Sequence, residues 1–240
     1  MITLCLDFGN TRLKAAIFTK ETFTIDMVIE GDALPFIESL IDQYKPQKSI
    51  LSSVIDHDPA IESLLASKTR FHKLTYSTKL NFSSPVGKPE TIGADRLALV
   101  AAAVHFYPGM NNLVIGLGSC ITYNFVNHLG HFLGGSISPG MDMRFRSMHE
   151  YTAKLPLVQA EWNIPLIGYD TKTNLQSGVI MGMANEIDGF IGKYNERYGN
   201  FNVVLTGGNS AYFASQLKNK IFADSNFLFK GLYALSEINN

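Results

Sequence analysis

The sequence predicts an α/β fold that is built from two similar halves. One observation is that apolar runs of strand length alternate with helical patterns along the chain. The other is that the opening pattern, an apolar run, a short break with glycine and a second apolar run at residues 2–18, returns at residues 113–126. Such self-similarity indicates an internal duplication. We therefore expect two domains, over residues 1–108 and 109–240.

The two copies can be aligned on their glycines. When Gly9 is placed over Gly118, the first copy has Asp7 where the second has Gly116. A glycine–asparagine break between apolar runs favours a hairpin, because both residue types tolerate a positive φ. Each half is thus expected to open with a strand, a turn of the size that holds a phosphate, and a second strand.

The composition is that of a globular protein. Of the 240 residues, 46% are hydrophobic and 17% are charged, which is enough apolar material for a core. The formal net charge of -1 favours neither a nucleic acid nor a membrane as a partner. Cys5 and Cys120 lie in apolar runs, so we expect buried free thiols and no disulfide scaffold. No apolar run is long enough to span a bilayer and no signal-peptide pattern opens the chain, so we expect a cytoplasmic protein.

The first half is expected to contain three strands, a helix, a strand and a second helix. Apolar residues at helical spacing predict the first helix, which Pro46 ends. Asp58 followed by Pro59 is a good N-cap and first-turn pair for the second helix. After the opening strand, the expected ranges are strands over 13–19, 23–30 and 49–55 and helices over 34–44 and 59–65.

A long polar loop at residues 75–92 leads into an alanine-rich helix. Loops of this length in a compact domain are often functional. Asp95 lies in the first turn of the helix, beside Arg96. The pair fits two interpretations: complementation of the helix dipole with a local ion pair, or a general base beside an anion-binding arginine. The alanines have high helix propensity and let another helix approach closely.

The second half repeats the strand, turn and strand, and then has longer helices. Glycines in its third strand let the backbone approach a ligand or another strand. A later strand runs into Gly207 and Gly208 and then a helix, which is a seat for a nucleotide, although many strand-to-helix turns carry a glycine pair. After the strands within 113–126, the expected elements are strands over 131–138 and 202–205, helices over 141–151, 171–198 and from 210, a loop over 154–168, and a final strand and helix over 227–238.

Asp7 stands where the first strand ends. A carboxylate beside free backbone N–H groups can hold a hydrated Mg²⁺ next to a phosphate. An ordinary hairpin with a solvated aspartate fits the same stretch, because aspartate and glycine are common in turns. The six histidines have no ligand-like spacing, which argues against a catalytic metal held by histidine.

Three segments in this order, residues 7–11, 116–119 and 206–208, resemble the layout of the superfamily that includes sugar and acetate kinases, heat-shock ATPases and actin. This resemblance implies two duplicated ribonuclease H-like domains, with mixed sheets flanked by helices and a nucleotide cleft between the domains. Further motifs are similar to those of type III pantothenate kinase. They are Gly-Ala-Asp-Arg-Leu-Ala at 93–98, Leu-Gly-Gly-Ser-Ile-Ser-Pro-Gly at 133–140, Thr-Ala-Lys-Leu-Pro at 152–156 and Thr-Lys-Thr-Asn-Leu-Gln-Ser-Gly at 171–178.

The resemblance implies an enzyme that uses ATP and Mg²⁺ to phosphorylate pantothenate to 4'-phosphopantothenate, the first step of coenzyme A biosynthesis. It also implies a homodimer whose subunit interface helps to form the acceptor pocket. By the same resemblance Asp7 holds Mg²⁺ and Asp95 is the catalytic base. The implied ATP-binding residues are Asp7, Phe8, Gly9, Asn10, Thr11, Arg12, Leu13, Lys14, Ser119, Gly207 and Gly208. The implied pantothenate-binding residues are Gly93, Ala94, Asp95, Arg96 and Thr171, with Val86 as the nearest counterpart of a family tyrosine.

Two positions depart from the family pattern. The family's second phosphate turn carries an aspartate that binds a monovalent cation and, further on, a threonine, and here these residues are Gly116 and Ser119. The lost carboxylate argues against a potassium or ammonium site of the usual kind. With Val86 in place of the tyrosine, we expect either an altered affinity for the acceptor or another residue that forms this wall of the pocket. Two alternatives therefore stay open: a kinase of the same superfamily that acts on another small hydroxyl acceptor, and a non-catalytic regulatory or binding relative.

Overall fold

The structure is a computed structural model that describes residues 1–85 and 87–240. Val86 lies outside the described residues, so the expectation placed on it is not addressed. The chain divides into two compact units. Unit 1 consists of residues 1–109, 126–133 and 226–240, and unit 2 of residues 110–125 and 134–225. The continuous domain limits expected from the sequence stay a prediction.

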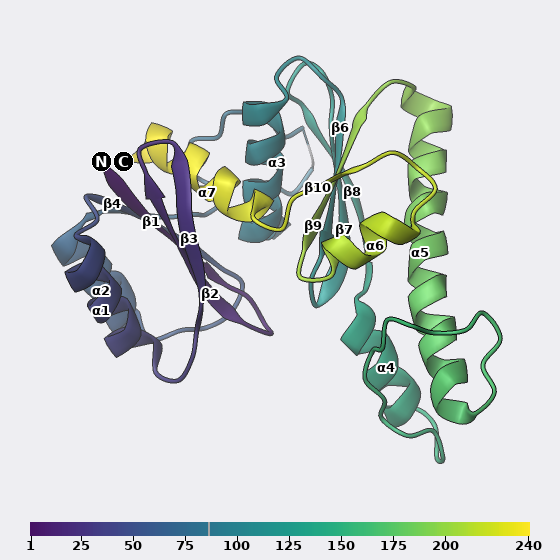
Figure 1. Cartoon of the computed structure of the whole chain (residues 1–240). Coiled ribbons are helices and arrows are strands. Elements are labelled where there is room, and N and C mark those ends of the chain that lie inside the picture. Colours follow the sequence, from purple (N-terminus) through teal and green to yellow (C-terminus); the bar gives the residue numbers. More distant parts are fainter. Residues whose placement is uncertain (86) are drawn as a thin grey trace. The chain divides into compact units, whose positions relative to one another are not determined.

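Unit 1 is a five-stranded sheet with helices on both faces (Figure 1). The strand order is β3-β2-β1-β4-β5, with β1 antiparallel to β2 and parallel to β4. Apolar side chains of β1 pack with α1 and α2 on one face, while α7 and α3 lie against β1 and β4. The elements are β1 (Ile2–Phe8), β2 (Leu13–Thr19), β3 (Thr22–Ile29), α1 (Ala33–Tyr44), β4 (Lys48–Ser53), α2 (Pro59–Lys68), β5 (Arg70–Lys73), the 3₁₀ turn η1 (Pro89–Thr91), α3 (Ala94–Phe106) and α7 (Phe227–Asn239).

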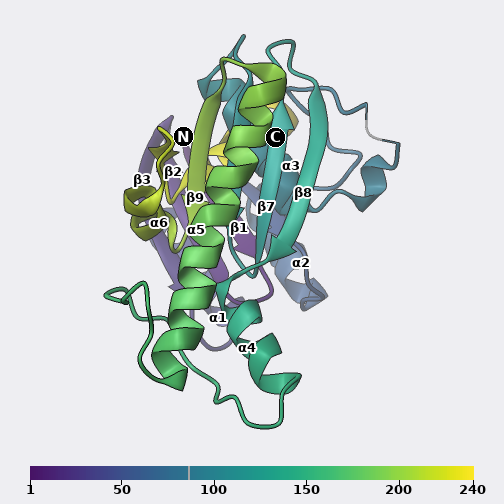
Figure 2. The same ribbon diagram turned by 90° about the vertical axis from the view of Figure 1, so that its right-hand side faces the viewer.

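Unit 2 contains the second sheet, in the order β10-β9-β6-β7-β8. The long helix α5 runs along this sheet and shares an apolar core with β6, β7 and β9 (Figure 2). The end of β7 and the start of β8 group with unit 1. The elements are β6 (Asn112–Leu117), β7 (Cys120–Val126), β8 (Phe132–Pro139), α4 (Met141–Glu150), α5 (Thr171–Tyr198), β9 (Asn202–Gly207), α6 (Ser210–Gln216) and β10 (Phe222–Ala223).

The two sheets have the same topology, which confirms the predicted duplicated α/β fold. Read from the third strand of each half, the orders β3-β2-β1-β4-β5 and β8-β7-β6-β9-β10 correspond strand by strand. The register also corresponds, because Asp7 pairs with Ser52 across β1 and β4, and Gly116 pairs with Thr206 across β6 and β9. Asp7 and Gly116 therefore occupy equivalent places in the two sheets, as the alignment of the two glycines predicts.

The structure corrects the prediction for the C-terminal tail. Residues 227–238 form the single helix α7 and contain no strand, and the short strand β10 lies before them. Gly231 explains the helix contact, since a β-carbon there would lie 1.9 Å from the backbone oxygen of Ala98. The close approach expected at the alanines of α3 is thus made by α7. The sequence analysis also missed β5, a strand of four residues.

Among the helices of the described part of the chain, none has both the length and the apolar character that a membrane span requires.

Candidate active site

Asp7 lies one residue before the end of β1 and is contacted from both neighbouring strands. The hydroxyl of Ser52 on β4 donates a hydrogen bond of 3.2 Å to Asp7 Oδ1, and Lys14 pairs with Asp7 in register on β2. The pKa of Asp7 is raised to about 6, mainly by burial and secondly by the negative charge of Asp95, while the hydrogen bond from Ser52 and the charge of Lys14 lower it. The ionised carboxylate is therefore disfavoured in the isolated protein, and a bound cation would favour it.

The turn after Asp7 forms the predicted hairpin, but not for the predicted reason. Gly9 donates its backbone N–H to the backbone oxygen of Arg12 at 3.1 Å and closes the turn between β1 and β2. Neither Gly9 nor Asn10 has a positive φ, so the turn does not depend on the left-handed conformation. Asn10, Thr11 and Arg12 are exposed, which leaves this turn accessible to a ligand.

Asp95 lies in the first turn of α3, as predicted. Gly93 is the N-cap residue, and the Asp95 carboxylate turns back toward it, so that a β-carbon at Gly93 would lie 2.5 Å from Asp95 Oδ1. Burial raises the pKa of Asp95, while hydrogen bonds from backbone N–H groups, first that of Arg96, and the Arg96 charge lower it. A buried carboxylate with a raised pKa is a stronger proton acceptor than a solvated one. The site is thus suited to a general base and also uses the helix N-terminus.

Arg96 lies over an aromatic ring. Its guanidinium carbon is 5.8 Å from the ring centroid of Phe132, which in turn packs edge-on against Phe82 at 6.2 Å. A backbone bridge between Ser83 and His131 joins the same two segments. The loop before α3 is therefore tied to the β7–β8 connection, and that connection positions the arginine.

In unit 2, two glycine-containing segments pack against the second turn. A β-carbon at Gly140 would lie 2.3 Å from the backbone oxygen of Gly118, and one at Gly207 would lie 2.2 Å from that of Leu117. Gly140 also donates its backbone N–H to Ser119 at 3.0 Å. Only residues without a side chain allow these approaches. The turn is therefore packed directly against the residues before α4 and against the glycine pair after β9.

Thr171 is the exposed first residue of α5. The N-cap residue of α5 is Asp170, whose side chain accepts from the Thr173 backbone N–H at 2.8 Å within a capping box. Unit 1 holds Asp7, Gly93, Asp95 and Arg96. Unit 2 holds Ser119, Thr171, Gly207 and Gly208.

Sequence analysis missed the polar network at the end of β8. Glu186 on α5 accepts hydrogen bonds from Tyr123 at 3.1 Å and from Ser138 at 2.5 Å, and pairs with Arg144 at 2.5 Å. Burial raises the pKa of Glu186, but the hydrogen bonds from Arg144 and Ser138 outweigh burial and lower it overall. A periodic apolar pattern on α5 with one glutamate inside it is the signal that could have pointed to this residue.

The donor set at Asp7 fits Mg²⁺. Within the residues that the structure describes, no group of three or more His, Cys, Asp or Glu side chains could hold a metal ion by itself. Mg²⁺ usually binds through one or two carboxylates and keeps water and phosphate oxygens as its other ligands. Asp7, with the hydroxyl of Ser52 beside it and the charge of Asp95 acting on it, offers that kind of hard, negative oxygen site.

The chain is similar to known proteins over most of its length. The family model for type III pantothenate kinase matches residues 3–193. The chain is 40% identical over 240 residues to the type III pantothenate kinase of Christiangramia forsetii, covering 99% of each chain. It is similar in structure to a conserved protein from Campylobacter jejuni, described as a candidate Baf family transcriptional activator, with a TM-score of 0.60, 20% identity and 98% of each chain covered.

A second solved structure, of a candidate N-acetylmannosamine kinase from Listeria monocytogenes, matches with a TM-score of 0.56 at 12% identity and covers 100% of both chains. At such identities the likeness concerns the fold alone, and it confirms the predicted fold class.

Proposed function

The chain belongs to the type III pantothenate kinase family, and from this premise we propose the roles of its site residues. The enzyme catalyses ATP-dependent phosphorylation of pantothenate to 4'-phosphopantothenate, the first step of coenzyme A biosynthesis. Phosphoryl transfer depends on positioning, on neutralising phosphate charge and on a base near the attacking hydroxyl. The observation that carries the assignment of roles is that Asp7 and Asp95 lie in unit 1 close enough for the charge of Asp95 to raise the pKa of Asp7.

Asp7 is the residue that holds Mg²⁺. Its carboxylate is directed by Ser52, and its raised pKa reflects a place where a cation is electrostatically favoured. When bound, Mg²⁺ neutralises charge on the phosphate oxygens. The exposed turn of residues 9–12 and Lys14 bind the ATP phosphates beside Asp7. Phe8 and Leu13 flank this turn at the strand ends. For unit 2, taken by itself, Ser119, Gly207 and Gly208 are the residues to which the family resemblance gives a role in ATP binding.

Asp95 accepts the proton of the pantothenate hydroxyl. Its carboxylate is fixed by the N-terminus of α3, and its raised pKa favours proton acceptance. Arg96 binds the carboxylate of pantothenate, since a guanidinium suits that group and Phe132 orients it. Gly93, Ala94 and Thr171 complete the acceptor site.

Three further properties belong to the same proposal. The kinase works without the usual potassium or ammonium site, because Gly116 provides no carboxylate. It acts in the cytoplasm. It forms a homodimer, which size-exclusion chromatography with light scattering would detect as twice the chain mass.

The test is ADP release from ATP and Mg²⁺, with and without pantothenate, for the wild type and for Asp95→Asn. We expect turnover that requires pantothenate and falls in the variant by about 10²–10⁴-fold, the range of a positioned base. Turnover only with another alcohol would assign a different acceptor. An active Asp95→Asn variant would remove Asp95 from the role of base.

A further inference from the structure

The end of β4 and the turn that follows it, residues 52–54, lie beside Asp7 and beside Gly93 at the start of α3. Ser52 donates to the Asp7 carboxylate, and Val54 donates its backbone N–H to the backbone oxygen of Phe8 at 3.0 Å. A β-carbon at Gly93 would lie 3.9 Å from Val54 Cγ1, so the turn also lies beside the residue that makes room for Asp95. The position of this turn therefore affects both carboxylates.

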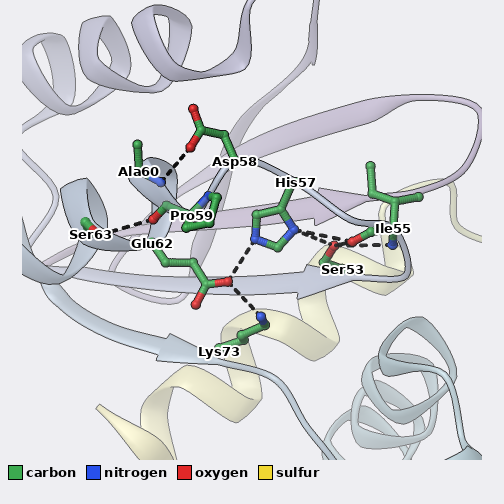
Figure 3. A network of polar contacts seen from close by, with 9 residues as sticks. All are labelled: Ser53, Ile55, His57, Asp58, Pro59, Ala60, Glu62, Ser63 and Lys73. Atoms are coloured by element: carbon green, nitrogen blue, oxygen red, sulfur yellow. Dashed lines mark hydrogen bonds and ion pairs between the residues drawn. The ribbon is translucent and has the colours of Figure 1, made fainter.

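His57 fixes the course of the turn (Figure 3). One ring nitrogen, Nδ1, lies 3.0 Å from Ser53 Oγ, and the other, Nε2, lies 2.9 Å from Glu62 Oε1 on α2. The ring edge meets the ring of Phe8 with centroids 5.3 Å apart and planes at 85°. The His57 side chain is only 9% exposed. The imidazole thus connects β4, α2 and the end of β1.

The hydrogen-bond directions show how the network is held. The Ser53 hydroxyl donates to the backbone oxygen of Ile55 at 2.9 Å, and its oxygen lies 3.0 Å from Nδ1 of His57. Glu62 can only accept while it is ionised, so Nε2 is the donor in the contact with Glu62. Lys73 on β5 donates to the same Glu62 oxygen at 2.7 Å, and this hydrogen bond is the main cause that lowers the pKa of Glu62. The charged side chains of this network are thus Glu62, which contacts His57, and Lys73, which contacts Glu62.

A serine, a histidine and a carboxylate in a row also occur in hydrolases, but this arrangement does not supply a nucleophile. The Ser53 hydroxyl uses its proton on Ile55 O, and its oxygen accepts from Ile55 N at 3.4 Å and lies 3.0 Å from His57 Nδ1. These hydrogen bonds hold the turn. The network therefore has a structural role: it fixes the positions of the neighbouring residues and takes no part in making or breaking bonds.

We propose that His57, held by Glu62, is a positioning residue for phosphoryl transfer. It supports Phe8 and the turn at residues 52–54, and through Ser52 and Val54 it holds the carboxylates of Asp7 and Asp95 in their working geometry. This inference rests on the proposed roles of Asp7 and Asp95. Small displacements at a phosphoryl-transfer site reduce the rate, because the reaction depends on alignment.

The test compares His57→Ala, Glu62→Ala and Glu62→Gln with a matched control, His72→Ala. His72 is a half-buried histidine of the same unit that bonds a hydroxyl, Thr78 Oγ1, at 2.9 Å, and its strand β5 pairs with β4 and not with β1. We expect His57→Ala and Glu62→Ala to lower kcat about tenfold or more with little change in the KM for pantothenate. Glu62→Gln keeps an oxygen acceptor for Nε2 and should restore most of kcat.

The second readout does not use activity. Calorimetric titration of a non-hydrolysable ATP analogue should show that Mg²⁺ improves nucleotide affinity less in His57→Ala than in the wild type and in His72→Ala. Equal kcat and equal Mg²⁺ effect in the two histidine variants, at similar melting temperatures, would overturn the proposal. The positioning role is measured as the kcat of each variant divided by the kcat of the wild type, so it can be tested only with an active wild type. A wild type that does not turn over pantothenate would instead count against the proposed roles of Asp7 and Asp95.

Discussion

The carboxylate of Asp95 occupies the space into which a side chain at Gly93 would extend. A β-carbon at Gly93 would lie 2.5 Å from Asp95 Oδ1, closer than two such atoms can approach, and the next nearest atom belongs to the same carboxyl group. Gly93 has an ordinary φ of -58°, so the backbone itself would accept alanine. The glycine is needed here for the position of a side chain two residues away.

Gly93→Ala is therefore expected to displace the Asp95 carboxylate and to lower kcat by about 10–100-fold, in line with the effect of a misplaced catalytic group. The melting temperature should change little, since Asp95 is a flexible side chain that can move. Gly182→Ala on α5 is the control, because a β-carbon there meets nothing within 4 Å. Unchanged kinetics in Gly93→Ala would show that the carboxylate position is not limiting.

The raised pKa of Asp7 predicts a pH-dependent stability. Its pKa rises from 3.8 to about 6 on folding, so the folded protein binds a proton that the unfolded chain has lost, and this stabilisation disappears as the pH rises through 6. Without Mg²⁺ and above pH 6, Asp7→Asn should melt about 6–12 °C higher than the wild type. Below pH 4 the two should agree. Scanning calorimetry in metal-free buffers measures both limits.

The same variant separates folding from function. Asp7→Asn should lose turnover, and Mg²⁺ with ATP should raise the melting temperature of the wild type but not that of the variant, because a ligand stabilises only the state that binds it. A variant that is stabilised by Mg²⁺ and ATP as much as the wild type would mean that Asp7 does not hold the ion.

The second copy of the opening turn leads to a prediction about monovalent cations. Gly116 occupies the register position that Asp7 has in the first sheet, so the second turn has no carboxylate there. The rate should depend little on whether sodium, potassium or ammonium is the salt cation at constant ionic strength. Strong activation by potassium or ammonium would show that other ligands form such a site.

Much of this arrangement could be predicted from the sequence. The apolar periods and the repeated glycine turn indicate two sheets with the same connections, and the register of Asp7 and Gly116 follows from their alignment. The hydrogen bond from Ser52 to Asp7 and the network around His57 could not be predicted, because both depend on side chains that meet only when parallel strands pair at a specific register. The prediction for the C-terminal tail was partly wrong, because its apolar residues suit either a strand or a helix. Only the packing against α3 decides for the helix.

The partly buried ion pair between Arg144 and Glu186 is expected to contribute more to the free energy of unfolding than an exposed ion pair of the same chain. The two side chains are 21% and 23% exposed, and Glu186 also accepts from Tyr123 and Ser138. Glu186→Ala leaves three donors without their acceptor, so unfolding free energy should fall by about 2–3 kcal/mol, below the range for fully buried pairs. Glu196→Ala removes the exposed pair with Lys193, where both side chains are more than half exposed, and should cost about 0.5 kcal/mol or less. Urea unfolding of both variants measures the difference, and equal losses would contradict the role assigned to the Glu186 network.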